Sequence, residues 1–189
     1  AIIEPENMYY CLALFNSKVF DLYLSIVNPT MNVQVKDIRN FPIIRREDVL
    51  KRVEYIEKRN VEIAKEDWDS FEISMDFKMH PILIYKDDNG TLEDAFNRWA
   101  EVSEKRFNEL RSNEEELNRL FISIYGLHSE VFKDIDERDI TIRRADRERD
   151  IKLLISYAVG CMFGRYSMDR SFTPSIDNII PVLDDEYFK

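Results

Sequence analysis

Residues 91–125 read TLEDAFNRWAEVSEKRFNELRSNEEELNRLFISIY and decide the fold class. Thr91 and Asp94 have the spacing of a capping box, the side-chain pair that begins many helices. Large apolar residues then recur every three or four positions with charges between them, the pattern of an amphipathic helix. They are Leu92, Ala95, Phe96, Trp99, Val102 and Leu110, followed by Leu117, Leu120, Phe121 and Ile124. We expect two consecutive helices, one from Thr91 and one from about Asn113 to a C-cap at Gly126.

Further helices are predicted on both sides of this stretch. The nearly continuous apolar run that begins after Pro5 predicts a buried helix, or two short ones, ending at Asn28-Pro29. Another helix begins at Glu47, and a last one runs from about Asp146 to Tyr166. We expect its inward face to consist of Ile151, Leu154, Ile155, Ala158, Val159, Met162 and Phe163. Four glycines leave little material for the tight turns of a large sheet, so the chain is predicted to be mainly α.

One short segment has a different periodicity. From Asn32 to Ile38 apolar and polar residues alternate, which predicts a strand with Val33 and Val35 on one face. Residues 41–44 continue it as an extended piece. The predicted organisation is therefore a short α/β segment over residues 1–46, followed by a helical domain over residues 47–189.

Composition bounds the class of protein. The 189 residues are 44% hydrophobic and 34% charged, typical of a globular chain with one domain or two small ones. Cys11 and Cys161 lie in apolar helical patterns, which favours two free, buried thiols. No apolar stretch is long enough to span a bilayer and no secretory signal is seen, so we expect a cytoplasmic location and no membrane partner.

Charge is unevenly distributed along the chain. The net charge is −10, which argues against general affinity for nucleic acid. Residues 16–60 nevertheless hold nine Lys/Arg against six Asp/Glu, whereas residues 61–140 hold ten against twenty-one. Residues 141–170 are basic again, with seven Lys/Arg against four Asp/Glu. DNA would therefore meet the first and third blocks and avoid the second.

The sequence contains no catalytic constellation. A cofactor cradle needs clustered glycines that open a helix, whereas Gly160 and Gly164 lie inside an apolar helical pattern. His80 and His128 are isolated from each other and from the cysteines, so no metal site is expected. We predict no catalytic residue, no metal and no cofactor in this chain.

Several segments, in this order, resemble parts of certain DNA methyltransferases. LFNSKVF at residues 14–20 is similar to a recurrent helix, and NPTMNVQVKDI at 28–38 with FPI at 41–43 to a strand that closes their target-recognition region. DWDSFE at residues 67–72, ITIRRADRERD at 140–150 and ISYAVGCMFGRY at 155–166 resemble the PglX branch. That branch comprises the adenine-specific methyltransferases of BREX phage-defence systems.

The resemblance implies a parent protein that methylates adenine at N6 with S-adenosylmethionine. The glycine-rich motif and the Asn-Pro-Pro-Tyr loop of that family match no position here, since Asn28-Pro29-Thr30 lacks the second proline and the aromatic ring. Residues 1–46 would then be the end of a target-recognition region, in a non-catalytic C-terminal part. The implied partners are DNA through the parent, its catalytic methyltransferase domain and other defence-system subunits.

The residues also point to DNA contacts near the N-terminus. Amide and ammonium groups on one face of the expected strand suit base edges and phosphates, and the arginines that follow suit phosphates. The candidates are Asn32, Gln34, Lys36, Arg39, Arg45 and Arg46. The alternative is that Asn32 and Gln34 are simply the solvated side of an edge strand.

Two other segments and the function as a whole have competing interpretations. The charged run from Arg143 to Asp150 is expected to form intrahelical ion pairs on an exposed face, with DNA contact as the minority view. The aromatic segment from Trp68 to Phe77 is expected to fill the core rather than stack on bases. The alternative for the whole chain is a free-standing helical protein-interaction module with no nucleic-acid role.

Overall fold

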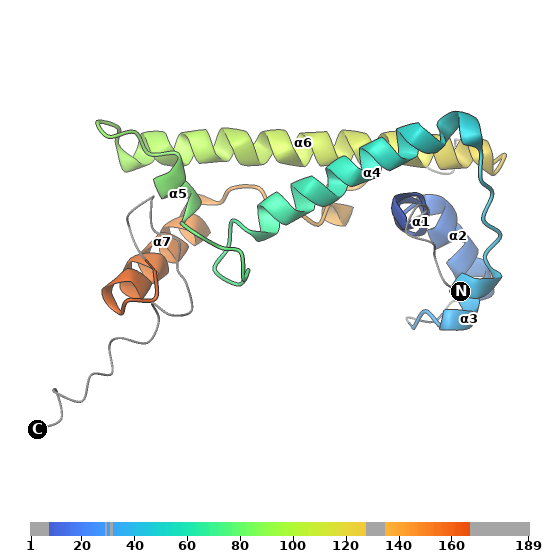
Figure 1. Ribbon diagram of the computed structural model, residues 1–189, viewed down its shortest axis with the longest axis horizontal. Coiled ribbons are helices and arrows are strands. Elements are labelled where there is room, and N and C mark those ends of the chain that lie inside the picture. Colours follow the sequence, from blue (N-terminus) through green and yellow to red (C-terminus); the bar gives the residue numbers. More distant parts are fainter. Residues whose placement is uncertain (1–7, 29, 31, 128–134, 167–189) are drawn as a thin grey trace, which may run out of the picture. The chain divides into compact units, whose positions relative to one another are not determined.

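The computed structural model describes residues 8–28, 30, 32–127 and 135–166 (Figure 1). These residues form helices and no strand, which confirms the mainly α prediction. The elements are α1 (Met8–Phe15), α2 (Lys18–Val27), α3 (Val35–Asn40), α4 (Glu47–Trp68), α5 (Pro81–Ile84), α6 (Leu92–Ile124), the 3-10 turn η3 (Glu137–Asp139) and α7 (Arg147–Met162). The expected helix start at Pro5 and the isolated His128 lie outside the described residues.

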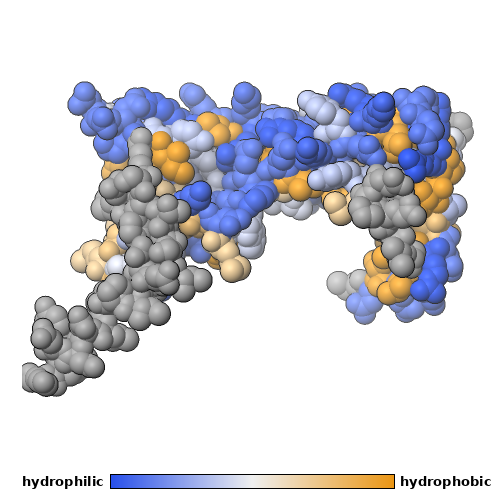
Figure 2. All heavy atoms as spheres, viewed as in Figure 1, coloured by the Kyte–Doolittle hydropathy of each residue, from blue (hydrophilic) through white to orange (hydrophobic). Residues whose placement is uncertain are grey.

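By its contacts the chain divides into two compact units, each built from two separate stretches. Unit 1 comprises residues 1–63 and 108–141, and unit 2 comprises residues 64–107 and 142–189. Helices α4 and α6 therefore contribute residues to both units. Much of the surface that these two helices present in Figure 2 is hydrophilic, as the charge pattern of their sequences predicts.

The predicted strand over residues 32–38 is wrong, because helix α3 occupies most of that segment. Gln34 is the N-cap of α3, and its backbone N–H donates to Asp37 Oδ2 at 3.0 Å. The Asn28 side chain donates to the same oxygen at 2.7 Å, and Asp37 is buried. A carboxylate three residues after the N-cap stabilises a helical turn. Val33 and Val35, the expected inward face, are 51% and 70% exposed.

The core of unit 1 forms around α1, α2 and the C-terminal half of α6. Phe41, between α3 and α4, lies at its centre: its ring is 4.8 Å from that of Tyr23, 5.1 Å from Phe20 and 5.7 Å from Tyr125. The buried members of this core are Tyr10, Ala13, Leu14, Val19, Phe20, Phe41, Leu50, Val53, Ile56, Leu117, Phe121 and Ile122.

Helix α6 is one helix of 33 residues, so the predicted break near Asn113 is wrong. Asn113 lies inside the helix, and its side chain donates to Asn60 Oδ1 of α4 at 2.8 Å. Both ends agree with prediction. Thr91 and Asp94 exchange hydrogen bonds as a capping box. Gly126 has φ 64°, and the Leu127 N–H reaches the Ile122 carbonyl, which is a Schellman C-cap.

Two carboxyl groups of unit 1 have raised pKa values, that of the buried Glu57 on α4 and that of the half-buried Glu114 on α6. Burial raises the pKa of Glu57 to about 7, against which a hydrogen bond from the Asn60 side chain acts. Burial also raises the pKa of Glu114 to about 7, and the charge of Glu57 adds to that rise. Both groups therefore favour the protonated form in the folded chain, and unit 1 loses stability when they ionise.

Glu57→Gln is expected to make the chain more stable at pH 8 than the wild type. The pKa of Glu57 is about 7 in the folded chain and 4.5 in the unfolded chain. Between these two values the folded chain keeps a proton on Glu57 that the unfolded chain has lost, so the free energy of unfolding falls as pH rises above about 4.5. The gain should be on the order of 2–3 kcal/mol at pH 8 and vanish near pH 4.5. Denaturant titrations at the two pH values measure it. An equal gain in stability at both pH values would contradict the raised pKa of Glu57. Glu54→Gln on the same helix is the control.

Unit 2 has a separate core around Trp99, which lies on α6 with Ala95 and packs on Ile82 of α5. Its indole Nε1 donates to Asp150 Oδ2 of α7 at 2.9 Å. Asp150 is also buried, and its other oxygen accepts from Arg149 Nε at 2.8 Å. The aromatic segment fills this unit as predicted, since Phe71 and Phe77 are buried, whereas Trp68 at the end of α4 is 53% exposed.

The charged run from Arg143 to Asp150 forms the predicted exposed helical face only in part, because Arg147 and Glu148 are exposed on α7 and Glu148 pairs with Lys152, whereas Arg143 and Arg144 precede the helix. Helix α7 begins only at Arg147, and Asp146 is its N-cap. The Arg144 guanidinium lies 3.8 Å from the centre of the Phe107 ring, and that of Arg143 lies 4.8 Å from the centre of Phe71. These arginines cover aromatic rings of unit 2, an arrangement that alternating charge in the sequence does not reveal.

The inward face predicted for the last helix is also largely wrong. Tyr157 and Gly160 are buried, and Ile151 and Leu154 pack partly against the Trp99 core. The rest of the expected face is exposed, with Ile155 at 60%, Val159 at 44%, Met162 at 84% and Phe163 at 80%; Ala158 is exposed as well. Helix α7 is apolar on two opposite sides, so its sequence alone does not show which side is inward.

Two sequence expectations concern the cysteines and membranes. Cys11 is buried and Cys161 is half-buried, and both thiols are free. Within the described ranges, no single helix is long and apolar enough to cross a bilayer; α1 and α2 pass that test only together, across a bend of 62°.

Candidate nucleic-acid interface

The six candidate DNA-contact residues all belong to the segment between α2 and the start of α4. Asn32 and Gln34 precede α3, Lys36 and Arg39 lie on it, and Arg45 and Arg46 stand directly before α4. All six are exposed. The structure therefore presents them on a helix and its two flanking loops instead of on one face of a strand.

Two tyrosine hydroxyl groups and the Phe41 ring hold this segment to unit 1. Tyr10 donates its hydroxyl to the Ile44 carbonyl at 2.6 Å, and Tyr125 donates to the Pro42 carbonyl at 2.7 Å. Burial raises the pKa of Tyr10 to about 12, so this donor stays protonated at neutral pH. With the Phe41 ring in the core, these bonds fix the backbone of residues 41–44 while the cations on either side remain in solvent.

The four cations differ in their present partners. Arg45 pairs with Glu47 at 3.3 Å and Arg46 with Asp48 at 2.5 Å, and both pairs are exposed. The Arg46 guanidinium lowers the pKa of Asp48 by hydrogen bonding. No ion pair within the described part of the chain involves Lys36 or Arg39. Exposed pairs of this kind contribute little to stability, so a phosphate can replace the carboxylate at low cost.

Asp37, the single carboxylate between residues 28 and 46, is buried and not available to a ligand. Asp37 accepts from the Gln34 backbone and from Asn28, and these two bonds lower its pKa. The Asn28 side-chain oxygen in turn accepts from the Thr30 N–H at 3.2 Å, a turn of the kind expected at Asn28-Pro29-Thr30. Because Asp37 is buried, the exposed side chains of this segment carry positive charge only.

Exposed apolar side chains surround these cations, and sequence reasoning missed them. The alternation of apolar and polar residues from Asn32 to Ile38 predicts that Val33 and Val35 face inward. The sequence therefore predicts no exposed apolar surface here. The exposed residues are Ile26, Val27, Val33, Val35, Ile38, Ile43 and Ile44, each at least 38% exposed. The surface is thus a mixture of apolar and basic groups, which suits a protein partner as well as a nucleic acid.

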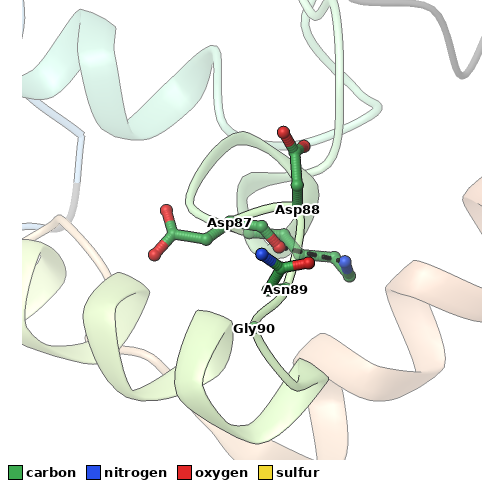
Figure 3. A pocket seen from close by; sticks show the side chains of 5 residues that line it. Asp87, Asp88, Asn89 and Gly90 are labelled. Carbon is green, nitrogen blue, oxygen red and sulfur yellow. Dashed lines mark hydrogen bonds between the residues drawn. The ribbon is translucent and has the colours of Figure 1, made fainter.

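The turn at residues 86–90 lines a surface pocket and is a second candidate site. Its polar groups instead hold the turn in place. In Figure 3 the side chains of Asp87, Asp88 and Asn89 point away from one another. Asp87 pairs with Arg98 of α6 at 2.6 Å, and the Gly90 N–H donates to the Asp87 carbonyl at 3.1 Å. Across the described residues no group of three His, Cys, Asp or Glu side chains could hold a metal ion.

All four glycines have structural roles that leave no cofactor cradle among them. Gly90 closes the turn before α6, and Gly126 and Gly164, at φ 64° and 72°, end helices. Gly160 lies against the Tyr166 ring, where a Cβ would come within 2.7 Å of Cδ2. None of the four glycines therefore lies in a glycine-rich loop that opens a helix.

Two curated proteins are similar to this chain over 98% of its length. One is the adenine-specific methyltransferase PglX of Lacticaseibacillus casei (strain Zhang), which is 36% identical over 204 aligned positions. The other is the adenine-specific methyltransferase BrxX of Escherichia coli O9:H4 (strain HS), 27% identical over 224 positions. No family model matches the chain.

The chain spans only 17% of the length of the first protein and 18% of the second. The resemblance to the PglX branch found in the sequence is thus confirmed over nearly the whole length of the chain. Over nearly its whole length this chain is therefore similar to one limited region of the adenine-specific methyltransferases PglX and BrxX.

Proposed function

We propose that this chain is a non-catalytic C-terminal part of a site-specific DNA adenine-N6 methyltransferase of a phage-defence system, and that its segment 32–46 contacts the DNA. The observation that carries the proposal is the exposed basic segment, whose one carboxylate is buried. The names of the two relatives supply the substrate class. In this proposal residues 1–46 end a target-recognition region and residues 47–189 form a helical domain.

The cations would bind phosphates and so position the duplex. Lys36 and Arg39 lie on the solvent side of a six-residue helix that Asp37 and Phe41 attach to unit 1. Arg45 and Arg46 follow within a few residues, at a fixed backbone. Such contacts set register and orientation but carry no sequence information. The acidic stretch 61–140 would face away from DNA, because like charges repel at short range.

Base reading would fall mainly to Asn32. Its side chain makes no hydrogen bond to any other described residue, whereas its carbonyl accepts from Asn28 at 2.9 Å. Gln34 is the N-cap of α3, which restrains its backbone. An asparagine amide can pair with the two polar atoms of an adenine edge in the major groove.

Methyl transfer itself would take place elsewhere in the parent protein. There S-adenosylmethionine would supply the methyl group, and a base-gripping loop absent from this sequence would hold the flipped adenine. The partners of this chain would accordingly be the catalytic methyltransferase domain, DNA, and other subunits of the defence system.

The salt dependence of DNA binding tests the basic segment. We expect the 189-residue chain to bind duplex DNA weakly, because its net charge is −10. Lys36→Gln with Arg39→Gln should reduce the slope of log affinity against log salt by about 1.8, since each phosphate contact contributes roughly 0.9. Fluorescence anisotropy between about 50 and 200 mM salt measures the slope.

The matched control carries Lys58→Gln with Lys105→Gln, two exposed lysines on α4 and α6. This pair changes net charge by the same amount, away from the segment. An equal loss of slope in both double variants would mean that net charge alone governs binding, and the proposed interface would be wrong.

A protein-interaction role without nucleic acid is the second candidate. It is favoured by the exposed apolar side chains around α3, of which Val35 at 70% and Ile26 at 73% are the most exposed. Val35→Ser with Ile26→Ser would then abolish docking to the catalytic domain and leave the DNA slope unchanged. Loss of the slope in this variant would favour DNA contact instead.

A further inference from the structure

Helix α7 carries an apolar stripe on the side opposite its buried face. Ile155, Val159 and Met162 follow one another at spacings of four and three residues, which places them along one side of a helix. Tyr157 and Gly160 lie on the other side and are buried. Singly exposed apolar residues are ordinary, but a contiguous stripe of this kind marks a surface that another group of atoms covers.

The apolar stripe continues beyond the C-terminal end of α7. Phe163, one residue beyond the helix, is 80% exposed. Along the edge, the segment after α4 meets α7 where Glu72 accepts from the Ser156 hydroxyl at 3.4 Å, and its neighbour Ile73 is 60% exposed. We call the set Ile155, Val159, Met162 and Phe163 the outer face of α7.

The chain reverses direction directly after this helix. Gly164 has φ 72°, and the Arg165 N–H donates to the Gly160 carbonyl at 2.8 Å, which is a Schellman turn. Tyr166 then stacks on Tyr157 with ring centres 5.2 Å apart, and its edge meets Phe77. Tyr166, the last residue that the structure describes, therefore lies beside Tyr157.

The 23 residues from 167 to 189 have the length and chemistry to cover the outer face. Helix α7 is about 24 Å long at 1.5 Å per residue, a distance that about eight extended residues span. The large apolar residues of this stretch are Met168, Phe172, Ile176, Ile179, Ile180, Val182, Leu183, Tyr187 and Phe188. Attachment at Tyr166 gives them a high effective concentration at the helix.

The charges of α7 and of residues 171–189 are also of opposite sign in part. From residue 147 to 166 the exposed charged side chains are Arg147, Lys152 and Arg165 against Glu148. Residues 171–189 contain four carboxylates and one lysine. Arg147 pairs with Glu93 and Lys152 with Glu148, so Arg165 is the cation of this set that would attract the acidic segment.

We propose that residues 171–188 of this chain bind the outer face of α7. The segment completes the burial of a helix that is apolar on two sides, and it forms an intramolecular cover for Ile155, Val159 and Met162. The proposal is independent of DNA binding, because none of the candidate DNA contacts belongs to unit 2.

Methionine oxidation of the full 189-residue chain tests the cover. Met162 is 84% exposed on α7, and Met8 of α1, at 52%, is the internal reference. Peroxide oxidises exposed methionines, and a cover present nine-tenths of the time slows the reaction about tenfold. We expect Met162 to react severalfold more slowly than Met8, as read by peptide mass spectrometry.

Substitutions in the segment separate the possible covers. Ile179→Ser with Ile180→Ser should remove the protection of Met162 and leave Met8 unchanged, whereas the control Ser171→Ala with Ser175→Ala should keep it. Met162 reacting as fast as Met8 in the wild-type chain would overturn the proposal. If the protection of Met162 disappears on dilution and light scattering shows a dimer, the outer face of α7 is covered by a second copy of the chain, and the proposal is wrong.

Discussion

Replacing Phe41 with alanine is expected to cost about 3–5 kcal/mol of the free energy of unfolding of unit 1. The ring is 6% exposed and touches aromatic rings from α1, α2 and the end of α6. Its removal leaves a cavity among side chains that already pack in ring-to-ring contact, so the surroundings cannot close it fully. Urea unfolding followed by circular dichroism measures the loss.

Ile43→Ala, two residues away and 47% exposed, is the control and should change stability by less than about 1 kcal/mol. The Phe41 variant should also bind DNA more weakly if the basic segment is the interface, because Phe41 anchors the backbone between Arg39 and Arg45. A small loss of stability on its removal would show that the segment is attached to unit 1 by other groups.

Replacing Asp150 with alanine should have a comparable effect on unit 2, about 3 kcal/mol. The side chain is 3% exposed and accepts from the Trp99 indole, the Asp146 backbone and Arg149. Alanine leaves a buried indole N–H and a partly buried guanidinium without their acceptor, and an unpaired buried polar group is costly.

Tryptophan fluorescence reports on this change directly, because Trp99 is buried and Trp68 is not. Glu148→Ala on the first turn of α7, where the side chain is 80% exposed, should change stability by less than about 0.5 kcal/mol. If both variants unfold at the same denaturant concentration, Asp150 does not hold α7 to the Trp99 core.

The sequence predicted the helices well where their ends carry a side-chain signal. Thr91 with Asp94 and the C-cap at Gly126 were identified correctly, because both depend on a few adjacent residues. The interior of α6 was not, since Asn113 reads as a helix start although its amide is used by Asn60 of α4. A partner 53 residues away has no trace in local sequence.

The candidate DNA interface was predicted by residue but not by conformation. Period-two alternation from Asn32 to Ile38 was taken for a strand, yet seven residues are too few to distinguish a strand from a capped helical turn. The bond between Asp37 and the Gln34 backbone decides in favour of the helix. The division of the chain near residue 46 and the DNA-contact roles of all six residues remain predictions.

Charge patterns in the sequence were misleading for a different reason. Alternating Arg and Asp from residue 143 onward predicts exposed ion pairs, but Arg144 and Arg143 cover the rings of Phe107 and Phe71. Stacking on a ring depends on where the ring lies after folding. In the described part of this segment, the i,i+4 pair of Lys152 with Glu148 is the kind of pair that spacing alone predicts.

The interleaved composition of the two units has a consequence for synthesis on the ribosome. Unit 1 needs residues 108–141, which are made long after its first stretch ends at residue 63. At 5–20 residues per second those 78 residues take roughly 4–16 s to translate. Until Phe121 is made, 58 residues after residue 63, Leu14 and Phe20 cannot pack against it, so the nascent chain displays an apolar surface to which ribosome-associated chaperones can bind.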